Sequence, residues 1–396
     1  MNPQLKKLCE IGEKQERLII GLMSGTSLDG LDVALCRFRG SGLDTKVELL
    51  HFKTVPYNAD MKARIKAVFA KKMIDFQLLT LLNPWIALLH GTMILNCLEG
   101  WKIEPGAVDL IASHGQTVLH APKILHELED YPNATLQIGD GDHLAFKTGI
   151  ITLSDFRQKH IAAGGEGAPL AVYGDFLLFS PPAENRILLN MGGIANFTWL
   201  PAGQDAAKVF VTDTGPGNTM LDAAVQHFYP GKFFDEDGKI AASGHIHNSL
   251  LDALKSDDYF QKPIPKTTGP ELFNLAYLRR AQQLSGSENL SPGDIIATLT
   301  RFSAETIADC IFKNIKNWRE ATIYSSGGGA HNPVLMTHLR DLLSGCPFFE
   351  MEKLGVAGDA KEAGLFAVLA NETIAGKPIN FGNLPSVFMG KISFPS

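Results

Sequence analysis

Cysteine is scarce and scattered in this sequence. The 396 residues include five cysteines, none in a CxxC pair or in a cluster with histidine at metal-ligand spacing: Cys9, Cys36, Cys97, Cys310 and Cys346. This pattern argues against a zinc ribbon or a disulfide scaffold, and it is typical of free thiols in a reducing compartment. We therefore expect a cytoplasmic protein.

Long apolar runs and basic runs are missing as well. No stretch approaches the ~20 apolar residues that a membrane span needs, and the short run 18–23 is typical of a strand rather than of a signal segment. The formal net charge is -6, and the positive residues are dispersed. The sequence therefore predicts neither a membrane nor a nucleic acid partner.

Several familiar catalytic motifs are also absent. The chain has no GxxxxGK[ST] loop, no GxSxG elbow, no HExxH pair and no GxGxxG followed by an acidic residue at Rossmann spacing. The residues that carry the chemistry must therefore be sought in other patterns.

The first such pattern is a turn of small residues between two predicted strands. Residues 18–23 and 31–35 have the apolar patterns of strands, and the turn 24–27 joins them. A glycine in such a turn lets a phosphate come close to the main chain, because no Cβ blocks it. Asp29 follows at the lip of the turn, where it could hold a magnesium ion or its water shell. An ordinary Gly/Ser hairpin turn has the same pattern.

A second strand–glycine–strand unit, 187–200, follows the Pro181-Pro182 pair and repeats this pattern around Gly192-Gly193. Two such hairpins, each opening a half rich in α and β elements, predict a duplicated α/β fold with a cleft between the halves. We place an N-terminal domain at 1–184, with 372–396 packing back onto it, and a C-terminal domain at 185–371.

Two further turns in the second half carry candidate residues. A predicted strand 208–212 ends at Asp213, and the helix after it starts at 218, where N–H groups and the helix dipole favour anions. The glycines 327–329 follow another strand and could lie flat against a planar ligand. Together the glycine turns suit a bound nucleotide, and Asp213 is the best candidate for the base that phosphoryl transfer requires.

In the first half, the predicted strand 108–113 ends in His114 and Gln116, at the position where open α/β sheets bind ligands. Taken alone, His114 is explained more simply as a hydrogen-bonded structural histidine. We also expect a helix that begins near Pro270 and runs through Leu278, and a solvated tail over 1–17.

A set of ordered sequence blocks links these features to a known family. The blocks are GLMSGTSLDG at 21–30, HGQ at 114–116, TGI at 148–150, DFR at 155–157, GAP at 167–169, NMGGIAN at 190–196, DTGPGN at 213–218, GGGA at 327–330 and KEA at 361–363. From about Leu18 to its last residues the chain resembles the anhydro-N-acetylmuramic acid kinases. That family lies within the superfold of actin, the sugar kinases and the heat-shock ATPases.

The resemblance implies an α/β kinase of two domains that uses ATP and Mg²⁺. In that family, water opens the 1,6-anhydro ring of 1,6-anhydro-N-acetylmuramic acid during peptidoglycan recycling, and the freed O6 takes the γ-phosphate. It implies that Asp213 is the general base for this water. It also implies a homodimer.

The resemblance likewise implies two sets of binding residues. The nucleotide set is Ser24, Gly25, Thr26, Ser27, Asp29, Gly192, Gly193, Gly215, Gly327, Gly328, Gly329 and Asn332, with Asp29 also as the metal ligand. The sugar set is His114, Gln116, Arg157, Glu166 and Glu362. The sequence departs from the family pattern at Glu166, where the family usually has glutamine, and a carboxylate offers the sugar a different contact at this position.

Two other functions fit the same blocks. A levoglucosan kinase shares nearly all of them, and the pocket for the N-acetyl and lactyl groups would discriminate the two. A non-catalytic sensor that binds nucleotide would lack the catalytic carboxylate or have a broken phosphate turn, and both are intact here.

Overall fold

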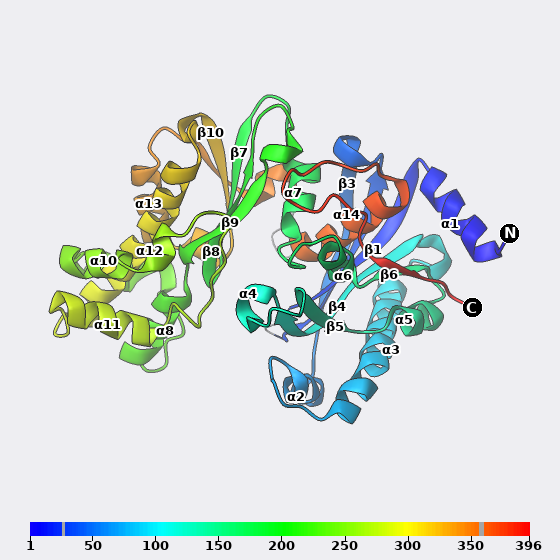
Figure 1. Ribbon diagram of the computed structural model, residues 1–396, viewed down its shortest axis with the longest axis horizontal. Helices are drawn as coiled ribbons and strands as arrows, with labels where there is room; N and C mark the ends of the chain where they lie inside the picture. Colours follow the sequence, from blue (N-terminus) through cyan, green and yellow to red (C-terminus); the bar gives the residue numbers. More distant parts are fainter. Residues whose placement is uncertain (26–27, 356–359) are drawn as a thin grey trace. The chain divides into compact units, whose positions relative to one another are not determined.

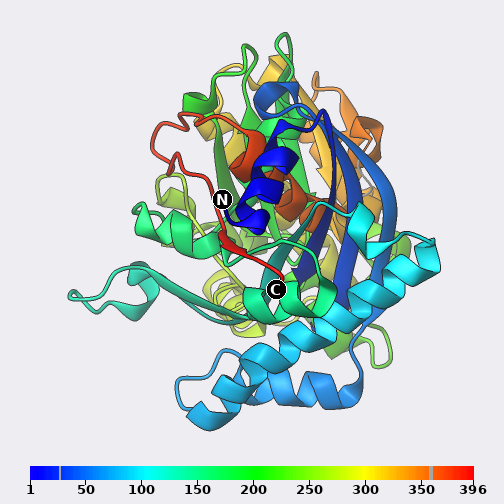
Figure 2. The same ribbon diagram turned by 90° about the vertical axis from the view of Figure 1, so that its right-hand side faces the viewer.

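The computed structural model describes residues 1–25, 28–355 and 360–396. The chain forms two compact units: unit 1 is Met1–Phe179 with Asp359–Ser396, and unit 2 is Ser180–Gly358. Figures 1 and 2 show the elements of each unit, which we describe separately. Two residues of the predicted phosphate turn, Thr26 and Ser27, lie outside the described residues.

Unit 1 is built on a mixed seven-stranded sheet. Six of its strands follow the order β12-β6-β4-β1-β2-β3, and the seventh, β5, pairs with β4. The β1–β2 and β2–β3 pairs are antiparallel, whereas β4 runs parallel to both β1 and β6. The strands are β1 (Glu16–Ser24), β2 (Gly30–Arg39), β3 (Lys46–Pro56), β4 (Leu110–Ala121), β5 (Ala134–Ile138), β6 (Thr152–Ser154) and β12 (Lys391–Ser393).

Helices cover this sheet. They are α1 (Pro3–Glu13), α2 (Ala59–Val68), α3 (Phe76–Trp101), α4 (Lys123–His126), α5 (Gly141–Thr148), α6 (Phe156–Ala162), α7 (Ala171–Phe179) and α14 (Lys361–Ala375), with the 3₁₀ turns η1 (Gly42–Asp44) and η2 (Pro105–Ala107). Among the described residues, α3 is the one helix long and apolar enough to cross a bilayer by length and composition. Core helices of soluble proteins meet the same criterion, and Leu82, Ile86 and Ile94 of α3 are buried in the core of unit 1.

Unit 2 repeats the strand order of unit 1. Its sheet runs β11-β10-β7-β8-β9, with antiparallel β7–β8 and β8–β9 pairs and parallel β7–β10 and β10–β11 pairs. This is the order β6-β4-β1-β2-β3 of unit 1, with the same strand directions. The predicted α/β fold with duplicated mixed sheets is therefore confirmed. The strands are β7 (Asn185–Met191), β8 (Ile194–Leu200), β9 (Phe210–Pro216), β10 (Ala321–Ser326) and β11 (Phe348–Glu350).

The helices of unit 2 are α8 (Thr219–Phe228), α9 (Lys239–Ser243), α10 (Asn248–Lys255), α11 (Leu275–Ser285), α12 (Pro292–Asn314) and α13 (Pro333–Leu342). Its 3₁₀ turns are η3 (Ala206–Lys208), η4 (Glu236–Gly238), η5 (Asp258–Gln261), η6 (Trp318–Glu320), η7 (Gly328–His331) and η8 (Met351–Leu354). Local chemistry fixes the start of α12, because the Ser291 side chain accepts the Asp294 N–H (3.1 Å) and Pro292 occupies the first turn.

The structure places α14 in unit 1, although the sequence analysis assigned residues up to 371 to the second domain. The reason lies in the small residues of this helix. α14 packs against β1 (Figure 1), and a Cβ on Gly21 of β1 would overlap the carbonyl oxygen of Ala363. A glycine facing an alanine-rich helix thus permits a close contact between strand and helix.

The predicted solvated tail over 1–17 is wrong. Residues Pro3–Glu13 form α1, whose Ile11 is buried, and α1 contacts α14. Arg17 is buried as well, and its guanidinium donates to Asn371 Oδ1 (2.7 Å) and to the Gly40 carbonyl oxygen (2.7 Å). The extension therefore belongs to the folded body of unit 1.

Two other predicted elements differ from the structure. The helix expected from Pro270 begins only at Leu275, because Asn274 is the residue whose side chain caps it. The strand expected to end before His114 instead continues through Ala121, because β5 pairs with its second half. His114 and Gln116 therefore lie inside β4 rather than after it.

Candidate active site

Asp213 is fixed in unit 2 by the segment 259–268. Its backbone N–H donates to the Lys266 carbonyl oxygen (3.0 Å), and the Tyr259 hydroxyl donates to the Asp213 carbonyl oxygen (3.1 Å). The Thr268 N–H donates to carboxylate atom Oδ2 (2.9 Å). Atom Oδ1 has no hydrogen-bond partner among the residues that the structure describes. One carboxylate oxygen is thus held, and the other is left for a water molecule.

The environment of Asp213 makes its carboxylate a stronger base than usual. Burial raises the pKa of Asp213 to about 6, the Thr268 N–H opposes this shift, and the negative charge of Glu271 adds to it. At pH 7 such a group is still mostly ionised, and it accepts a proton more readily than an ordinary aspartate. Asp213 lies within β9, which extends to Pro216 and does not end at 212 as predicted.

The turn at Gly192-Gly193 is bonded to the start of α8. The Gly193 carbonyl oxygen accepts the N–H groups of Gly217 (2.9 Å) and Thr219 (3.0 Å), and the Gly192 carbonyl oxygen accepts that of Asn218 (2.9 Å). The sequence predicts that N–H groups at this helix start are open to an anion. For these three groups the prediction is wrong, because the neighbouring turn already uses them.

Internal packing requires glycine at two positions just before α8, Gly215 and Gly217. Gly215 has a positive φ of 154°, and a Cβ there would lie 3.2 Å from atoms of Phe260 and Thr306. A Cβ on Gly217 would overlap the Gly192 carbonyl oxygen. The two turns therefore approach each other as closely as backbone atoms allow.

Helix α12 supports this turn. Ser303 Oγ donates to the Gly217 carbonyl oxygen (2.9 Å), and Thr306 Oγ1 donates to the Ser303 carbonyl oxygen (3.1 Å). Both side chains are buried. Ser303 thus links the centre of α12 to the turn between β9 and α8.

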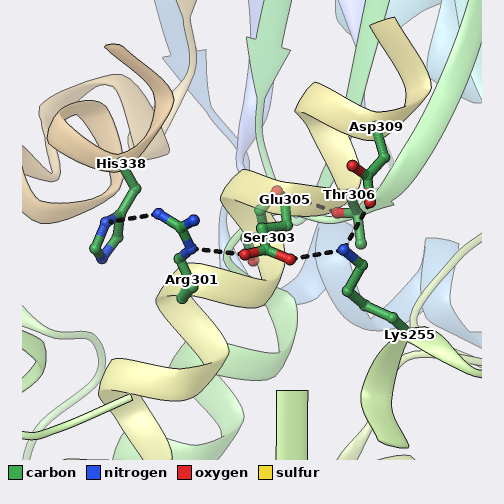
Figure 3. A network of polar contacts seen from close by, with 7 residues as sticks. All are labelled: Lys255, Arg301, Ser303, Glu305, Thr306, Asp309 and His338. Carbon is green, nitrogen blue, oxygen red and sulfur yellow. Dashed lines mark hydrogen bonds and ion pairs between the residues drawn. The ribbon is translucent and has the colours of Figure 1, made fainter. Parts of the chain in front are cut away.

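Ion pairs join α12 to α10, and a hydrogen bond joins it to α13, as Figure 3 shows. Glu305 accepts from Arg301 Nε (2.8 Å) and from Lys255 Nζ of α10 (2.6 Å), and Asp309 also pairs with Lys255 (2.7 Å). Arg301 contacts His338 Nδ1 of α13 (3.4 Å). The network restrains the helix that carries Ser303.

The three glycines after β10 serve different purposes. Gly327, with φ of 81°, and Gly329 lie against β7, because a Cβ on either would come within 2.8 Å of Met191 atoms. Gly328 is open, since its Cβ would meet nothing nearer than Asn218 Nδ2 at 3.4 Å. Two of the predicted adenosine-binding glycines are therefore explained by packing, and Gly328 is the one with space for a ligand.

Asn332, also predicted to bind nucleotide, caps α13. Its side-chain oxygen accepts the N–H groups of Val334 (3.0 Å) and Leu335 (3.1 Å). The amide oxygen is therefore committed to the helix.

In unit 1, Ser24 lies in a buried chain of hydrogen bonds. Its hydroxyl donates to Gln116 Oε1, so the Tyr57 hydroxyl at 2.8 Å must donate to Ser24 Oγ. His90 Nε2 lies 2.7 Å from the same Tyr57 oxygen and, by elimination, donates to it. Burial lowers the pKa of His90 to about 4, which keeps the ring neutral. Ser24 and Gln116 thus anchor the β1–β2 turn.

His114 and Arg157, both predicted to bind the sugar, are hydrogen-bonded to each other. Arg157 Nε donates to His114 Nε2 (2.9 Å), His114 Nδ1 donates to the Gly115 carbonyl oxygen (2.8 Å), and Arg157 Nη1 donates to the Gly167 carbonyl oxygen (3.0 Å). Burial, with the charge of Arg157, lowers the pKa of His114 to about 3. The ring is therefore a neutral acceptor that fixes the guanidinium.

The two glutamates predicted for the sugar differ in their surroundings. Desolvation raises the pKa of Glu362, the charge of Asp32 adds to this, and Arg157 opposes it. Glu166 is exposed and has no hydrogen bond or ion pair within the described ranges. The structure thus associates Glu362, but not Glu166, with Arg157.

Asp29 is the one predicted metal ligand. Its side chain is 77% exposed, and Lys62 Nζ lies 3.9 Å from its Oδ1. The described residues contain no group of three or more potential metal ligands. A single accessible carboxylate suits Mg²⁺, which keeps several waters and takes other ligands from substrate phosphates.

Sequence reasoning missed most of the partners of these groups. Tyr57 and His90 carry no motif, and only their burial in the fold reveals them. The polar stretch 266–271, Lys-Thr-Thr-Gly-Pro-Glu, overlaps the helix that the sequence predicts from near Pro270. Its Gly-Pro pair is also a turn signal, which could have separated it from the helix.

The chain belongs to the anhydro-N-acetylmuramic acid kinase family, whose model matches residues 17–391. Proteins named anhydro-N-acetylmuramic acid kinase are 54% identical in Pseudoalteromonas atlantica and 52% in Pseudoalteromonas translucida, in each case over all of both chains. One from Caldanaerobacter subterraneus is 37% identical over 98% of this chain and 100% of its own.

Solved structures show weaker likeness. The activator of 2-hydroxyisocaproyl-CoA dehydratase from Clostridium difficile, with bound ADPNP, has a TM-score of 0.43 and 10% identity over 90% of this chain and 95% of its own. Hexokinase from Schistosoma mansoni complexed with glucose has a TM-score of 0.35 and 10% identity over 90% and 86%. At these scores the likeness carries no argument about this chain.

Proposed function

We propose that this protein is an ATP-dependent kinase of 1,6-anhydro-N-acetylmuramic acid that acts in peptidoglycan recycling. The observation that carries the proposal is Asp213, a partly buried carboxylate with one oxygen held and the other open, in a chain that belongs to the kinase family over nearly its whole length. The product is N-acetylmuramic acid 6-phosphate.

In the proposed reaction, Asp213 takes a proton from water as the water oxygen bonds to the anomeric carbon of the sugar. The bond from this carbon to O6 breaks, and O6 attacks the γ-phosphorus of ATP. The bond from the γ-phosphorus to ADP then breaks, and the proton on Asp213 passes to solvent. A carboxylate that positions water suits the oxocarbenium-like transition state of acetal cleavage.

Other residues have supporting roles in this proposal. Residues 24–29 receive the phosphates of ATP, with Mg²⁺ on Asp29, where its charge would offset that of the phosphates. Arg157, oriented by His114, and Glu362 contact the sugar. The resemblance further supports a homodimer, and the five free cysteines support a cytoplasmic location.

A mass-resolved assay in ¹⁸O-water tests the function. The protein is incubated with ATP, Mg²⁺ and 1,6-anhydro-N-acetylmuramic acid, and with levoglucosan in parallel. We expect a phosphorylated amino sugar with one ¹⁸O at the anomeric carbon, formed faster than any levoglucosan product. A phosphorylated product without ¹⁸O would indicate an ordinary sugar kinase, and faster turnover of levoglucosan would change the substrate. No product from either sugar would favour a nucleotide-binding sensor.

A further inference from the structure

The segment that follows η5 in unit 2 makes a tight turn beside Asp213. Leu272 and Phe273 both donate their N–H groups to the Gly269 carbonyl oxygen (3.2 Å each). The side chain of Glu271 folds back over this turn, because a Cβ on Gly269 would overlap Glu271 Oε2. Gly269 therefore leaves room for a carboxylate next to Thr268, whose N–H holds Asp213 Oδ2.

Other charged groups near Asp213 are directed elsewhere. Lys266 Nζ lies over the Tyr259 ring, 4.2 Å from its centroid, and donates to the Tyr259 carbonyl oxygen (3.0 Å). On α12, Cys310 and Lys313 interact electrostatically with Lys266. Within the described residues Glu271 is thus the charged group that acts on the Asp213 carboxylate, while the Thr268 N–H opposes it.

We infer that the turn Thr268–Glu271 is the positioning element for the general base. Thr268 aims the Asp213 carboxylate through Oδ2 and favours its charged form, and Glu271 disfavours that form. The turn therefore sets both the direction of the free oxygen and the pH above which Asp213 accepts a proton. This inference rests on the proposed function, in which Asp213 activates water.

The two contributions have opposite signs and can be separated by mutation. Thr268→Pro removes the N–H and should move the acidic midpoint of the kcat/KM profile upward by about one pH unit. Glu271→Gln keeps the shape of an exposed side chain without its charge and should move the midpoint downward by roughly half a unit. Thr268→Ala keeps the N–H and should retain the wild-type midpoint.

A charge control is available in the same unit. Glu288 is an exposed carboxylate on the loop between α11 and α12, and Glu288→Gln should not move the midpoint. Thr268→Pro should also lower kcat more than it changes KM, since it misdirects the base without removing a substrate contact. A merely structural turn would shift neither midpoint.

The titration of Asp213 is also measured without substrate, from the carboxyl signal of ¹³C-labelled aspartate that disappears in Asp213→Asn. If the wild type fails to convert the anhydro sugar, the proposed function falls, and this titration still decides the role of the turn. Opposite shifts in Thr268→Pro and Glu271→Gln support the inference. An unchanged or raised midpoint in Glu271→Gln overturns it, including where Thr268→Pro does not fold.

Discussion

The two units use one strand order to build two different turns after their third strands. In unit 1, β3 ends at Pro56, Tyr57 donates its N–H to the Asp29 carbonyl oxygen, and Asn58 caps α2. In unit 2, β9 ends at Pro216, Gly217 donates its N–H to the Gly193 carbonyl oxygen, and Asn218 precedes α8. In both units the strand ends in proline, the next N–H group bonds to the turn of the first hairpin, and an asparagine precedes the helix.

The two turns differ at the residue between the proline and the asparagine. Tyr57 sends a buried side chain to Ser24 and His90, whereas no side chain fits at Gly217. Unit 1 therefore supports its hairpin by side-chain hydrogen bonds, and unit 2 by contact between backbones. The same strand order thus carries different side chains in the two units.

The largest expected effect tests the difference between β9 and β3, the third strands of the two units. Counting back three residues from each proline gives Asp213 in unit 2 and the exposed Lys53 in unit 1. Asp213→Asn should lower kcat by roughly 10²- to 10⁴-fold, since a general base contributes about that much, and should leave ATP affinity nearly unchanged. Steady-state kinetics and calorimetric titration with ATP measure the two.

Lys53→Asn is the matched control and should retain wild-type kcat. Comparable losses in both variants would mean that the two third strands are functionally alike. Unchanged turnover in Asp213→Asn would remove the carboxylate from the reaction.

A smaller effect is expected from Tyr57→Phe in unit 1. The change leaves His90 without its acceptor in a buried position, so the free energy of unfolding should fall by about 1–3 kcal/mol. Urea denaturation measures it. Tyr131→Phe alters an exposed tyrosine and should change stability by less than about 0.5 kcal/mol. Equal midpoints for the two variants would show that the hydrogen-bond chain does not stabilise the hairpin.

The smallest effect expected is an opposite pH response of the two units. In unit 1, burial lowers the pKa of His90 to about 4, of His114 to about 3 and of His160 to about 4. The unfolded chain then binds more protons between about pH 4 and 6.5, so this stabilisation is present above that range and is lost as the pH falls through it. The raised pKa values of Glu362 and Glu372 partly offset it.

In unit 2 two partly buried aspartates reverse the sign, and the lowered pKa of His338 partly offsets them. Burial raises the pKa of both Asp213 and Asp222 to about 6, so the folded state holds more protons and this stabilisation is lost as the pH rises from about 4 to 6. From pH 7 to pH 5, hydrogen exchange corrected for intrinsic rates should show less protection in unit 1 and more in unit 2, by on the order of 1 kcal/mol. Asp222→Asn should reduce the response of unit 2, and parallel responses would contradict the comparison.

The sequence predicted elements where the pattern is local. Both strand–glycine–strand hairpins follow from the apolar strand patterns on either side of their glycine turns. It failed where a distant segment decides: β5 extends β4 past His114, and the packing of α14 on Gly21 moves a helix from one unit to the other. The residues around His114 and Gly21 do not indicate that β5 and α14 pack against them.

The candidate residues show the same limit. Asp213 was found from its motif, but the residues that hold it, Tyr259 and Thr268, come from a segment whose Gly-Pro turn signal does not show what the segment packs against. The sequence predicts that the N–H groups at the start of α8 face an anion, and only the structure shows that those of residues 217–219 face the carbonyl oxygens of Gly192 and Gly193. A motif identifies the reacting group, whereas the fold determines which of its hydrogen-bonding atoms are already paired.

The place of α14 in unit 1 has a consequence for synthesis on the ribosome. Unit 2 is continuous in the chain, whereas unit 1 needs both ends, down to the contact between Gln4 Nε2 and the Ser396 carbonyl oxygen (3.2 Å). A nascent chain that has emerged to residue 358 therefore holds all of unit 2 but lacks the helix that covers Gly21. Unit 1, which contains the first residues to be synthesised, is therefore complete only after unit 2.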